Sequence, residues 1–366
     1  MHILNKEEVL GFVREREDLF DAAGHTNPFS CSAWVLHFIE QIATDDWVFF
    51  VPEYCTDGES LMLLYSKRGE PRRLMGLTNY YSSLYSPLIS SSADRNAALS
   101  MLVRQLVEPV PPYSIIDLAP LDQSTPELVE LRTAFAQYRW YVKEYFCFGN
   151  WYLPCTNLSF HEYMRQRPSQ LYNTWLRKSK KFSPGQDARL EIITDPSETD
   201  AAMEAYERVY ARSWKKPEPY SRFVQGWAKL CARNGWLRLG IAWVGDVPIA
   251  VQFWFTMHRR AYIFKLAYDE EYAKWSAGTM LTAHMVKWSF EQDHVIEIDY
   301  LTGDDAYKRF WMTARRERIG VRACNLRSAS GAIMAAIEVA GTLRRRWRPP
   351  TRLASATASV IDQHGE

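Results

Sequence analysis

The sequence lacks the patterns that mark several classes of protein. Its six cysteines form no Cys-x-x-Cys pair, so neither a zinc site nor a disulfide framework is indicated. The eight histidines show no metal-ligand spacing, and we expect no metal. No stretch approaches about 18 uninterrupted apolar residues, and no apolar segment follows Met1. We therefore expect no transmembrane segment or secretory leader, and a cytoplasmic location.

Motifs of three common enzyme classes are missing as well. There is no Gly-x-Ser-x-Gly, no phosphate-binding P-loop and no dinucleotide fingerprint, so hydrolases, kinases and dehydrogenases have no support. Net charge is also nearly absent, because 44 basic and 43 acidic side chains leave +1. This balance argues against a surface built wholly for nucleic acid or an anionic membrane.

The near-neutral total conceals an uneven distribution of charge. Residues 1–150 hold 12 basic and 20 acidic side chains, a net −8, which leaves +9 for residues 151–366. A large anionic ligand should therefore prefer the second half of the chain.

The first half alternates between helical and extended patterns. We expect helices over 6–20, 32–42, 94–107 and 126–138, with Asp94 as an N-cap, and strands over 47–51, 61–66, 72–77, 115–118 and 140–148. With 366 residues, 47% of them hydrophobic, the chain can form two domains with cores of their own. Alternating elements of this kind predict a mixed α/β fold.

The second half has a similar order of elements. A basic helical connector over 158–187 carries six basic and no acidic residues between Glu162 and Asp187. It is followed by a strand over 188–194, helices over 197–214 and 221–233, an antiparallel meander over 236–268, a helix to about residue 292, a strand over 295–299, a short helix over 306–313 and a strand over 321–326. The basic stretch is either a solvated helix face or a surface that contacts an anion.

These patterns divide the chain into four predicted parts. They are a degenerate N-terminal domain (1–157), the connector (158–187), a C-terminal domain (188–330), and a C-terminal helix with a basic and polar tail (331–366). We expect the two domains to be tandem copies of one fold, although no similarity between them is visible residue by residue.

Five short segments resemble one known family. They are Gly245-Asp246-Val247-Pro248-Ile249-Ala250, Lys265-Leu266-Ala267-Tyr268-Asp269, Ser276-Ala277-Gly278-Thr279-Met280-Leu281, Ile298-Asp299-Tyr300 with Gly303, and Tyr307-Lys308-Arg309-Phe310-Trp311. The region from about Leu158 to Leu326 resembles the CelD/FemAB-like branch of the GNAT acyltransferases. The resemblance implies an α/β fold with a mixed sheet and tandem GNAT-like domains, of which the C-terminal one carries the motifs.

The resemblance also implies a cofactor and its site. Acetyl-CoA, or another acyl-CoA, would lie where the fourth and fifth strands splay apart, with its pyrophosphate on Ser276, Ala277, Gly278, Thr279 and Met280. A helix N-terminus suits this task because its first backbone N–H groups lack partners within the helix. The chain keeps only Gly278 of the usual loop, Gln/Arg-x-x-Gly-x-Gly/Ala.

Three residues near the splay are the catalytic candidates. Asp299 could orient or deprotonate an amine, Lys308 could bind an anionic substrate or steady charge on the acyl group, and Tyr268 could protonate the departing thiolate. Ser213, Glu218, Asp269 and Tyr307 are the candidates for substrate binding. Each also has a plain structural reading, as a cap, an ion-pair partner, a loop residue or a packed side chain.

Three functions follow from these observations. The first is N-acyl transfer from a CoA thioester to a small-molecule amine, such as an amino sugar in polysaccharide biosynthesis. The second is Fem-like peptidyl transfer, with aminoacyl-tRNA bound by the basic connector. The third is a non-catalytic module that binds carbohydrate or a partner protein. The arginines of 344–348 either cap the last helix or make weak contact with anionic lipid.

Overall fold

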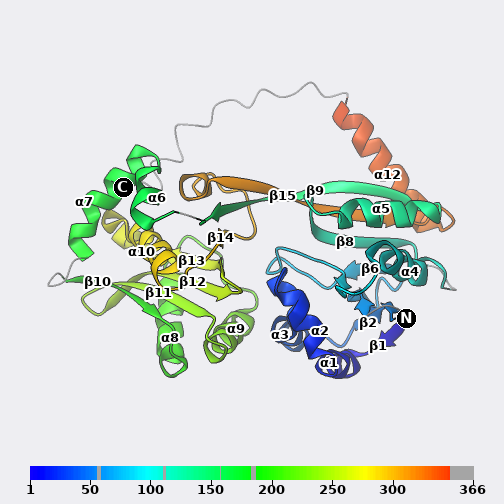
Figure 1. Cartoon of the computed structure of the whole chain (residues 1–366), viewed down its shortest axis with the longest axis horizontal. Coiled ribbons are helices and arrows are strands. Elements are labelled where there is room, and N and C mark those ends of the chain that lie inside the picture. The colour runs from blue at the N-terminus through cyan, green and yellow to red at the C-terminus, as the bar shows by residue number, and fades with distance from the viewer. Residues whose placement is uncertain (56–58, 110–112, 157, 183–186, 347–366) are drawn as a thin grey trace. The chain divides into compact units, whose positions relative to one another are not determined.

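The computed structural model describes residues 1–55, 59–109, 113–156, 158–182 and 187–346 (Figure 1). The chain divides by compactness into two units. Unit 1 consists of residues 1–149 and the segment that begins at Arg316, and unit 2 consists mainly of residues 150–315. The domain boundaries expected from the sequence, after residues 157, 187 and 330, stay a prediction. Residue 157, residues 183–186 and the tail from 347 lie outside the described residues.

Unit 1 combines a mixed sheet with helices and a small second sheet. In chain order its elements are β1 (His2–Leu4), α1 (Lys6–Arg14), α2 (Glu17–Gly24), η1 (Pro28–Ser30), α3 (Ser32–Ile42), β2 (Trp47–Val51), β3 (Glu53–Tyr54), β4 (Ser60–Leu61), β5 (Leu64–Lys67), β6 (Arg73–Gly76), β7 (Leu88–Ile89), α4 (Arg95–Val107), β8 (Ile115–Asp122), α5 (Glu127–Gln137), most of β9 (Tyr141–Pro154), most of β15 (Ala314–Cys324) and α12 (Ala329–Arg346).

Local sequence explains where several of these helices begin. The Asp94 side chain accepts a hydrogen bond from the Ala97 amide at 3.1 Å, which confirms the predicted N-cap of α4. The single helix expected over 6–20 is instead two helices, α1 and α2. Arg16 lies at the break, with its guanidinium 3.9 Å from the centre of the Phe12 ring and its Nε 2.5 Å from Glu59. The bond to Glu59 is a tertiary contact, so helical periodicity could not reveal this break.

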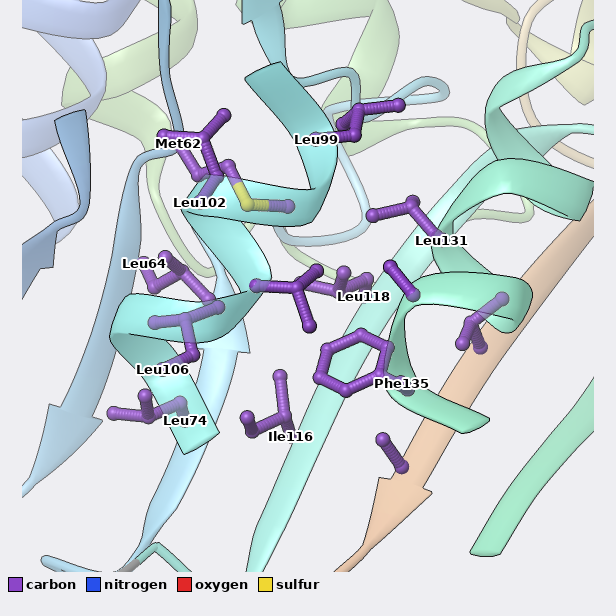
Figure 2. Close-up of a cluster of buried hydrophobic side chains, with 14 of the residues drawn as sticks. Met62, Leu64, Leu74, Leu99, Leu102, Leu106, Ile116, Leu118, Leu131 and Phe135 are labelled. Carbon is purple, nitrogen blue, oxygen red and sulfur yellow. The ribbon is translucent and has the colours of Figure 1, made fainter. Parts of the chain in front are cut away.

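The larger sheet of unit 1 has the order β1-β2-β5-β6-β8-β15-β9. Its pairs from β1 to β15 are antiparallel except for β6 and β8, which are parallel and are joined through α4. Figure 2 shows how α4 and α5 cover this sheet, with Leu102 and Leu106 of α4 and Phe135 of α5 meeting Leu74 and Ile116 from the strands. These five side chains are essentially inaccessible to water, so burial of apolar surface holds the layers together.

Unit 2 has its own sheet and helices. Its elements are the end of β9, α6 (Phe160–Arg165), α7 (Ser169–Ser179), η2 (Lys180–Phe182), β10 (Ala188–Ile193), η3 (Pro196–Glu198), α8 (Thr199–Ala211), α9 (Ser221–Arg233), β11 (Leu237–Val244), β12 (Val247–Met257), β13 (Arg260–Tyr268), η4 (Glu270–Trp275), α10 (Ala277–Glu291), β14 (Glu297–Asp299) and α11 (Lys308–Trp311). Strands β10 to β13 form an antiparallel meander, and β14 is parallel to β13.

The two units share one topology, and this confirms the predicted fold class. In both, a first strand and a group of helices lead into three antiparallel strands, then a helix, then a strand parallel to the last of the three. The final strands are exchanged along the chain. Residues 152–154 of β9 pair with β14 in unit 2, whereas residues 318–324 of β15, which follow unit 2 in sequence, pair with β8 in unit 1.

Strand β15 begins at Ala314 rather than at residue 321, where the sequence predicts it. Its first residues are mostly basic, and a polar run is a poor signal for a buried strand. The structure accommodates two of these charges by pairing Arg318 with Asp122 and Arg315 with Asp304.

Within the described part of the chain, every helix is too short or too polar to cross a membrane.

Candidate active site

The parallel ladder between β13 and β14 is short. It joins Arg260 to Glu297, Ala261 to Ile298 and Tyr262 to Asp299, and β14 ends there. Strand β13 continues to Tyr268, paired on its other side with β12, whose Ala250 lies opposite Tyr268. The pairing of β13 with β14 therefore ends at Tyr262, at the place where the resemblance implies that the two strands splay apart.

Helix α10 begins beside the end of β13. Ser276 is its N-cap and has a left-handed conformation, with φ of 53°. The first intrahelical bond recorded at this end runs from the Met280 amide to the Ser276 carbonyl, at 3.0 Å. Ahead of it lie the amides of Ala277, Gly278 and Thr279, in a first turn that contains no acidic residue. This end of α10 thus has the backbone polarity that suits a phosphate group.

The five residues predicted to hold the pyrophosphate differ in which of their atoms a ligand could contact. The side chains of Ala277 and Met280 are buried, at 4% and 3% exposure, so only their backbone could contact a ligand. A Cβ added at Gly278 would meet nothing nearer than Cδ1 of Tyr268, at 3.7 Å. The fold itself therefore tolerates alanine there, and there is open space beside the backbone at Gly278.

A buried glutamine that the sequence analysis missed ties α10 to the sheet. Gln252 of β12 donates through Nε2 to the Thr282 hydroxyl at 2.6 Å and to the Gly278 carbonyl at 3.2 Å. Its Oε1 accepts from the Trp254 indole at 2.9 Å. The sequence did contain a signal for this residue, because Gln252 is a polar residue within an apolar strand, and a buried amide needs hydrogen-bond partners.

Tyr268 and the loop between α8 and α9 lie at the same end of β13. The ring of Trp214, which is 43% exposed, is centred 4.7 Å from the Tyr268 ring. Burial raises the pKa of the Tyr268 phenol, and Glu270 adds to the effect. Asp269 is only 1% exposed; it caps η4 by accepting from the Glu271 amide, and Arg212 lies 3.6 Å away. Tyr268 is therefore brought to Gly278, whereas Asp269 lies beneath the surface.

The same loop contributes a cluster of charged side chains. Glu218 accepts from Lys265 of β13 at 2.6 Å, with both side chains largely buried, and the Tyr210 hydroxyl lies 3.4 Å from the same oxygen. Nζ of Lys215 lies 5.9 Å from the centre of the Tyr210 ring. Burial, together with the nearby cations of Lys265 and Lys308, lowers the pKa of Lys215 to about 8, although Glu218 and Asp305 oppose the change. Glu218, a predicted substrate-binding residue, thus belongs with Lys215 and Lys265 to what we call the lysine cluster. Ser213, the other predicted substrate-binding residue of this loop, donates from its hydroxyl to the Tyr210 carbonyl at 2.8 Å.

Asp299 holds the turn that follows β14. It is 2% exposed, and its Oδ1 accepts from the Asn150 side chain and from the Leu301 amide, both at 2.6 Å. Asn150 also donates to the Leu301 carbonyl at 2.9 Å. Leu301 adopts a left-handed conformation, with φ of 52°, which these bonds stabilise.

Lys308 lies close to this turn. It is 4% exposed, and its Nζ donates to the carbonyls of Thr302 at 2.6 Å and Gly303 at 3.2 Å, with Asp305 at 3.2 Å. Burial lowers its pKa, and Asp305 offsets part of the effect. Predicted Tyr307 packs edge-on against Tyr300, at 5.8 Å between ring centres. Asp299, Lys308 and Tyr307 therefore lie around one loop. Lys308 and Asp305 of this loop act electrostatically on Lys215, which belongs to the lysine cluster.

The basic connector packs beside the start of α10. Lys178 of α7 donates to the Lys274 carbonyl at 2.6 Å, and Nζ of Lys181 lies 4.8 Å from the centre of the Trp275 ring. Burial and the cations of Lys181 and Arg177 lower the pKa of Lys178. Basic side chains are thus gathered next to the helix N-terminus at Ser276, where an anionic ligand would reduce their mutual repulsion.

Comparison with known proteins identifies this region. Residues 169–309 match the model of the acetyltransferase (GNAT) domain family. No curated protein matches the chain.

Several solved structures share the fold of the chain across both units. FemX has a TM-score of 0.59 at 10% identity, over 92% of this chain and all of that one. L-PGS from Bacillus licheniformis has a TM-score of 0.54 at 12% identity, over 90% and 97% of the two chains. The C-terminal domain of a putative lysylphosphatidylglycerol synthetase from Agrobacterium fabrum has a TM-score of 0.52 at 10% identity, over 82% and 91%.

These matches agree with the geometry, because the end of the β13–β14 ladder and the start of α10 both fall inside the matched segment. The expected resemblance is confirmed: residues 169–309 match the acetyltransferase (GNAT) domain model, and the chain shares its fold with FemX.

Proposed function

We propose that unit 2 transfers an acetyl or other acyl group from a CoA thioester to an amine. The observation that carries the proposal is the end of the β13–β14 ladder at Tyr262, beside an α10 N-terminus with no acidic residue in its first turn. In GNAT enzymes the amine attacks the thioester carbonyl directly, so the protein needs to orient two substrates and manage protons. The acceptor in this proposal is a small amine such as an amino sugar of a polysaccharide precursor.

The residues present fit a CoA thioester. Backbone amides of 277–279 would hold the pyrophosphate, and the space at Gly278 lets that group approach the backbone. The connector lysines Lys178 and Lys181 lie beside the same turn and would balance further phosphate charge. The bound thioester supplies an activated acyl carbon.

Two side chains at the splay have suitable proton chemistry. Lys215 has a lowered pKa, so a fraction of it is neutral near pH 8 and can take a proton from the acceptor's ammonium group. The Tyr268 phenol lies beside Gly278 and can give its proton to the departing thiolate. For Asp299 and Lys308 we propose a positioning role, because both are buried and bonded to the loop after β14.

The test is the release of free thiol from acetyl-CoA in the presence of amines, amino sugars and nucleotide-linked amino sugars. We expect release that depends on one class of amine and falls roughly tenfold or more in Gly278→Ala. Gly11→Ala is the matched control, since a Cβ at Gly11 meets nothing within 4 Å and Gly11 lies in α1 of unit 1. Absence of turnover with every amine, together with absence of CoA binding, would refute the proposal.

A second candidate keeps the acyl acceptor but takes aminoacyl-tRNA as donor. It is favoured by the basic connector at the start of α10 and by the likeness to FemX. RNA held by Lys178, Lys181 and their neighbours would show a steep loss of affinity with salt. Tight, salt-sensitive binding of tRNA by a protein that ignores acyl-CoA would select this donor, whereas equal affinity at low and high salt would exclude it. A protein that binds sugar and turns over neither donor would be a binding module.

A further inference from the structure

Two polar side chains of helix α12 point inward, toward unit 1. Glu338 pairs with Arg322 of β15, and the Thr342 hydroxyl accepts from Lys143 at 2.9 Å. Ala335 is 5% exposed, and a Cβ at Gly331 would lie 2.3 Å from the Asn325 carbonyl. These four positions recur at three- and four-residue intervals, so they form one helical face, and their contacts establish which face meets the unit.

The opposite face of α12 is apolar and exposed. Ile333, Ile337 and Leu343 are 62%, 58% and 51% exposed, and Val339 is 43% exposed. From residue 333 to residue 343 every exposed side chain of the helix is apolar, and we call this set the apolar face of α12: Ile333, Ala336, Ile337, Val339, Ala340 and Leu343. A surface helix normally shows the reverse pattern, with its apolar stripe turned toward the core. A contiguous exposed apolar patch marks a surface that binds something.

The sequence places strong positive charge directly after this face. The helical backbone continues to Arg346, and residues 344–348 read Arg-Arg-Arg-Trp-Arg. Between Gly331 and Arg348 the only acidic residue is Glu338, whose carboxylate is already paired with Arg322. An apolar helical face next to a group of arginines has the composition that binds an anionic bilayer in the plane of its surface.

We propose that α12 docks on an anionic lipid surface, with its apolar face entering the boundary between headgroups and acyl chains. The positive charge that follows this face in the sequence favours anionic over neutral lipid. A second copy of the chain is the other conceivable occupant. It fits less well, because its α12 would bring the same arginines and no exposed carboxylate to oppose them.

The experiment is sedimentation of the full-length protein with vesicles of phosphatidylcholine, with or without about 30% phosphatidylglycerol. We expect the protein to pellet with the anionic vesicles and to remain in solution with the neutral ones. The double variant I333E/I337E should lose most of this binding, at least about tenfold in affinity. Replacing Arg344, Arg345 and Arg346 with glutamine should weaken binding and flatten its dependence on salt.

The matched control changes exposed apolar residues elsewhere in unit 1. Met101 of α4 and Val129 of α5 are 36% and 51% exposed, so M101E/V129E introduces the same charge on other helices and should bind vesicles like the original protein. Circular dichroism and the thermal midpoint verify that each variant is folded. Equal pelleting with neutral and anionic vesicles, or no pelleting at all, would overturn the proposal. So would light scattering that shows a dimer dissociated by I333E/I337E in a protein that ignores vesicles.

Discussion

At the scale of single residues, burial changes what each candidate can do. Asp299 and Lys308 belong to the motifs that predict the family, yet both are almost fully buried and engaged by the loop that they support. Lys215 belongs to none of the motifs, and its environment is made by Lys265, Glu218 and Lys308, which come from other parts of the chain. Sequence spacing could therefore predict Lys308 and could not predict the state of Lys215.

The lowered pKa of Lys215 leads to a prediction that needs no knowledge of the substrate. Trinitrobenzenesulfonate reacts with neutral amines, so labelling of Lys215, followed by peptide mass spectrometry, should rise with a midpoint near pH 8 and level off about one pH unit higher. In Lys265→Gln the midpoint should move upward, because a neighbouring cation is lost while Glu218 remains. Lys216, in the same peptide region, is the internal control. Labelling that still rises steeply beyond about pH 10 in the original protein would contradict the account.

The hydrogen bonds of Asp299 predict a cost in stability. Asp299→Ala would leave the buried Asn150 amide and the Leu301 N–H without this acceptor, so the free energy of unfolding in urea should fall by about 2–4 kcal/mol. Asp246→Ala is the comparison, since that side chain is exposed in the turn between β11 and β12 and its loss should cost less than about 1 kcal/mol. Equal effects of the two changes would show that Asp299 does not hold the turn.

At the scale of elements, local sequence predicted most helices and strands of both units. Caps and periodicity are local signals, which is why the N-cap at Asp94 and the helix Ser221–Arg233 agree with expectation. The deviations arise where a distant partner decides. Arg16 is bonded to Glu59 at the break between α1 and α2, and the basic start of β15 depends on Asp122 and Asp304.

The link between α10 and β12 through Gln252 also has a measurable consequence. Gln252→Leu keeps the side chain's bulk but leaves the buried Trp254 indole N–H without an acceptor and α10 without its tether. We expect the free energy of unfolding to fall by about 1–3 kcal/mol, and CoA binding to weaken with it. Gln137→Leu, at an exposed position of α5, should leave both unchanged. An unaltered unfolding curve for Gln252→Leu would contradict this role.

At the scale of the whole molecule, the chain is two related units whose last strands are exchanged. The repeated order of elements was visible in the sequence, since periodicity reports each helix and strand. The exchange of the last strands was not visible in the sequence, because the pairing of strands far apart along the chain leaves no local signal.

The exchange predicts different behaviour for two fragments. Residues 150–315 contain all of the sheet of unit 2, so this fragment should unfold cooperatively and bind ligand by itself. Residues 1–149 lack β15, and with it the core side chains Ile319, Val321 and Ala323, so this fragment should be aggregated or molten. Circular dichroism and urea titration test both. A cooperative transition for residues 1–149 alone would show that β15 is not needed.

The central claim is that the start of α10 holds the pyrophosphate of a CoA thioester. Calorimetric titration of the full-length protein with acetyl-CoA tests it most directly. The account predicts one site, an affinity that falls roughly tenfold or more in Gly278→Ala, and no change in Gly11→Ala. Failure of the original protein to bind acetyl-CoA or any longer acyl-CoA, or equal binding by Gly278→Ala, would contradict it.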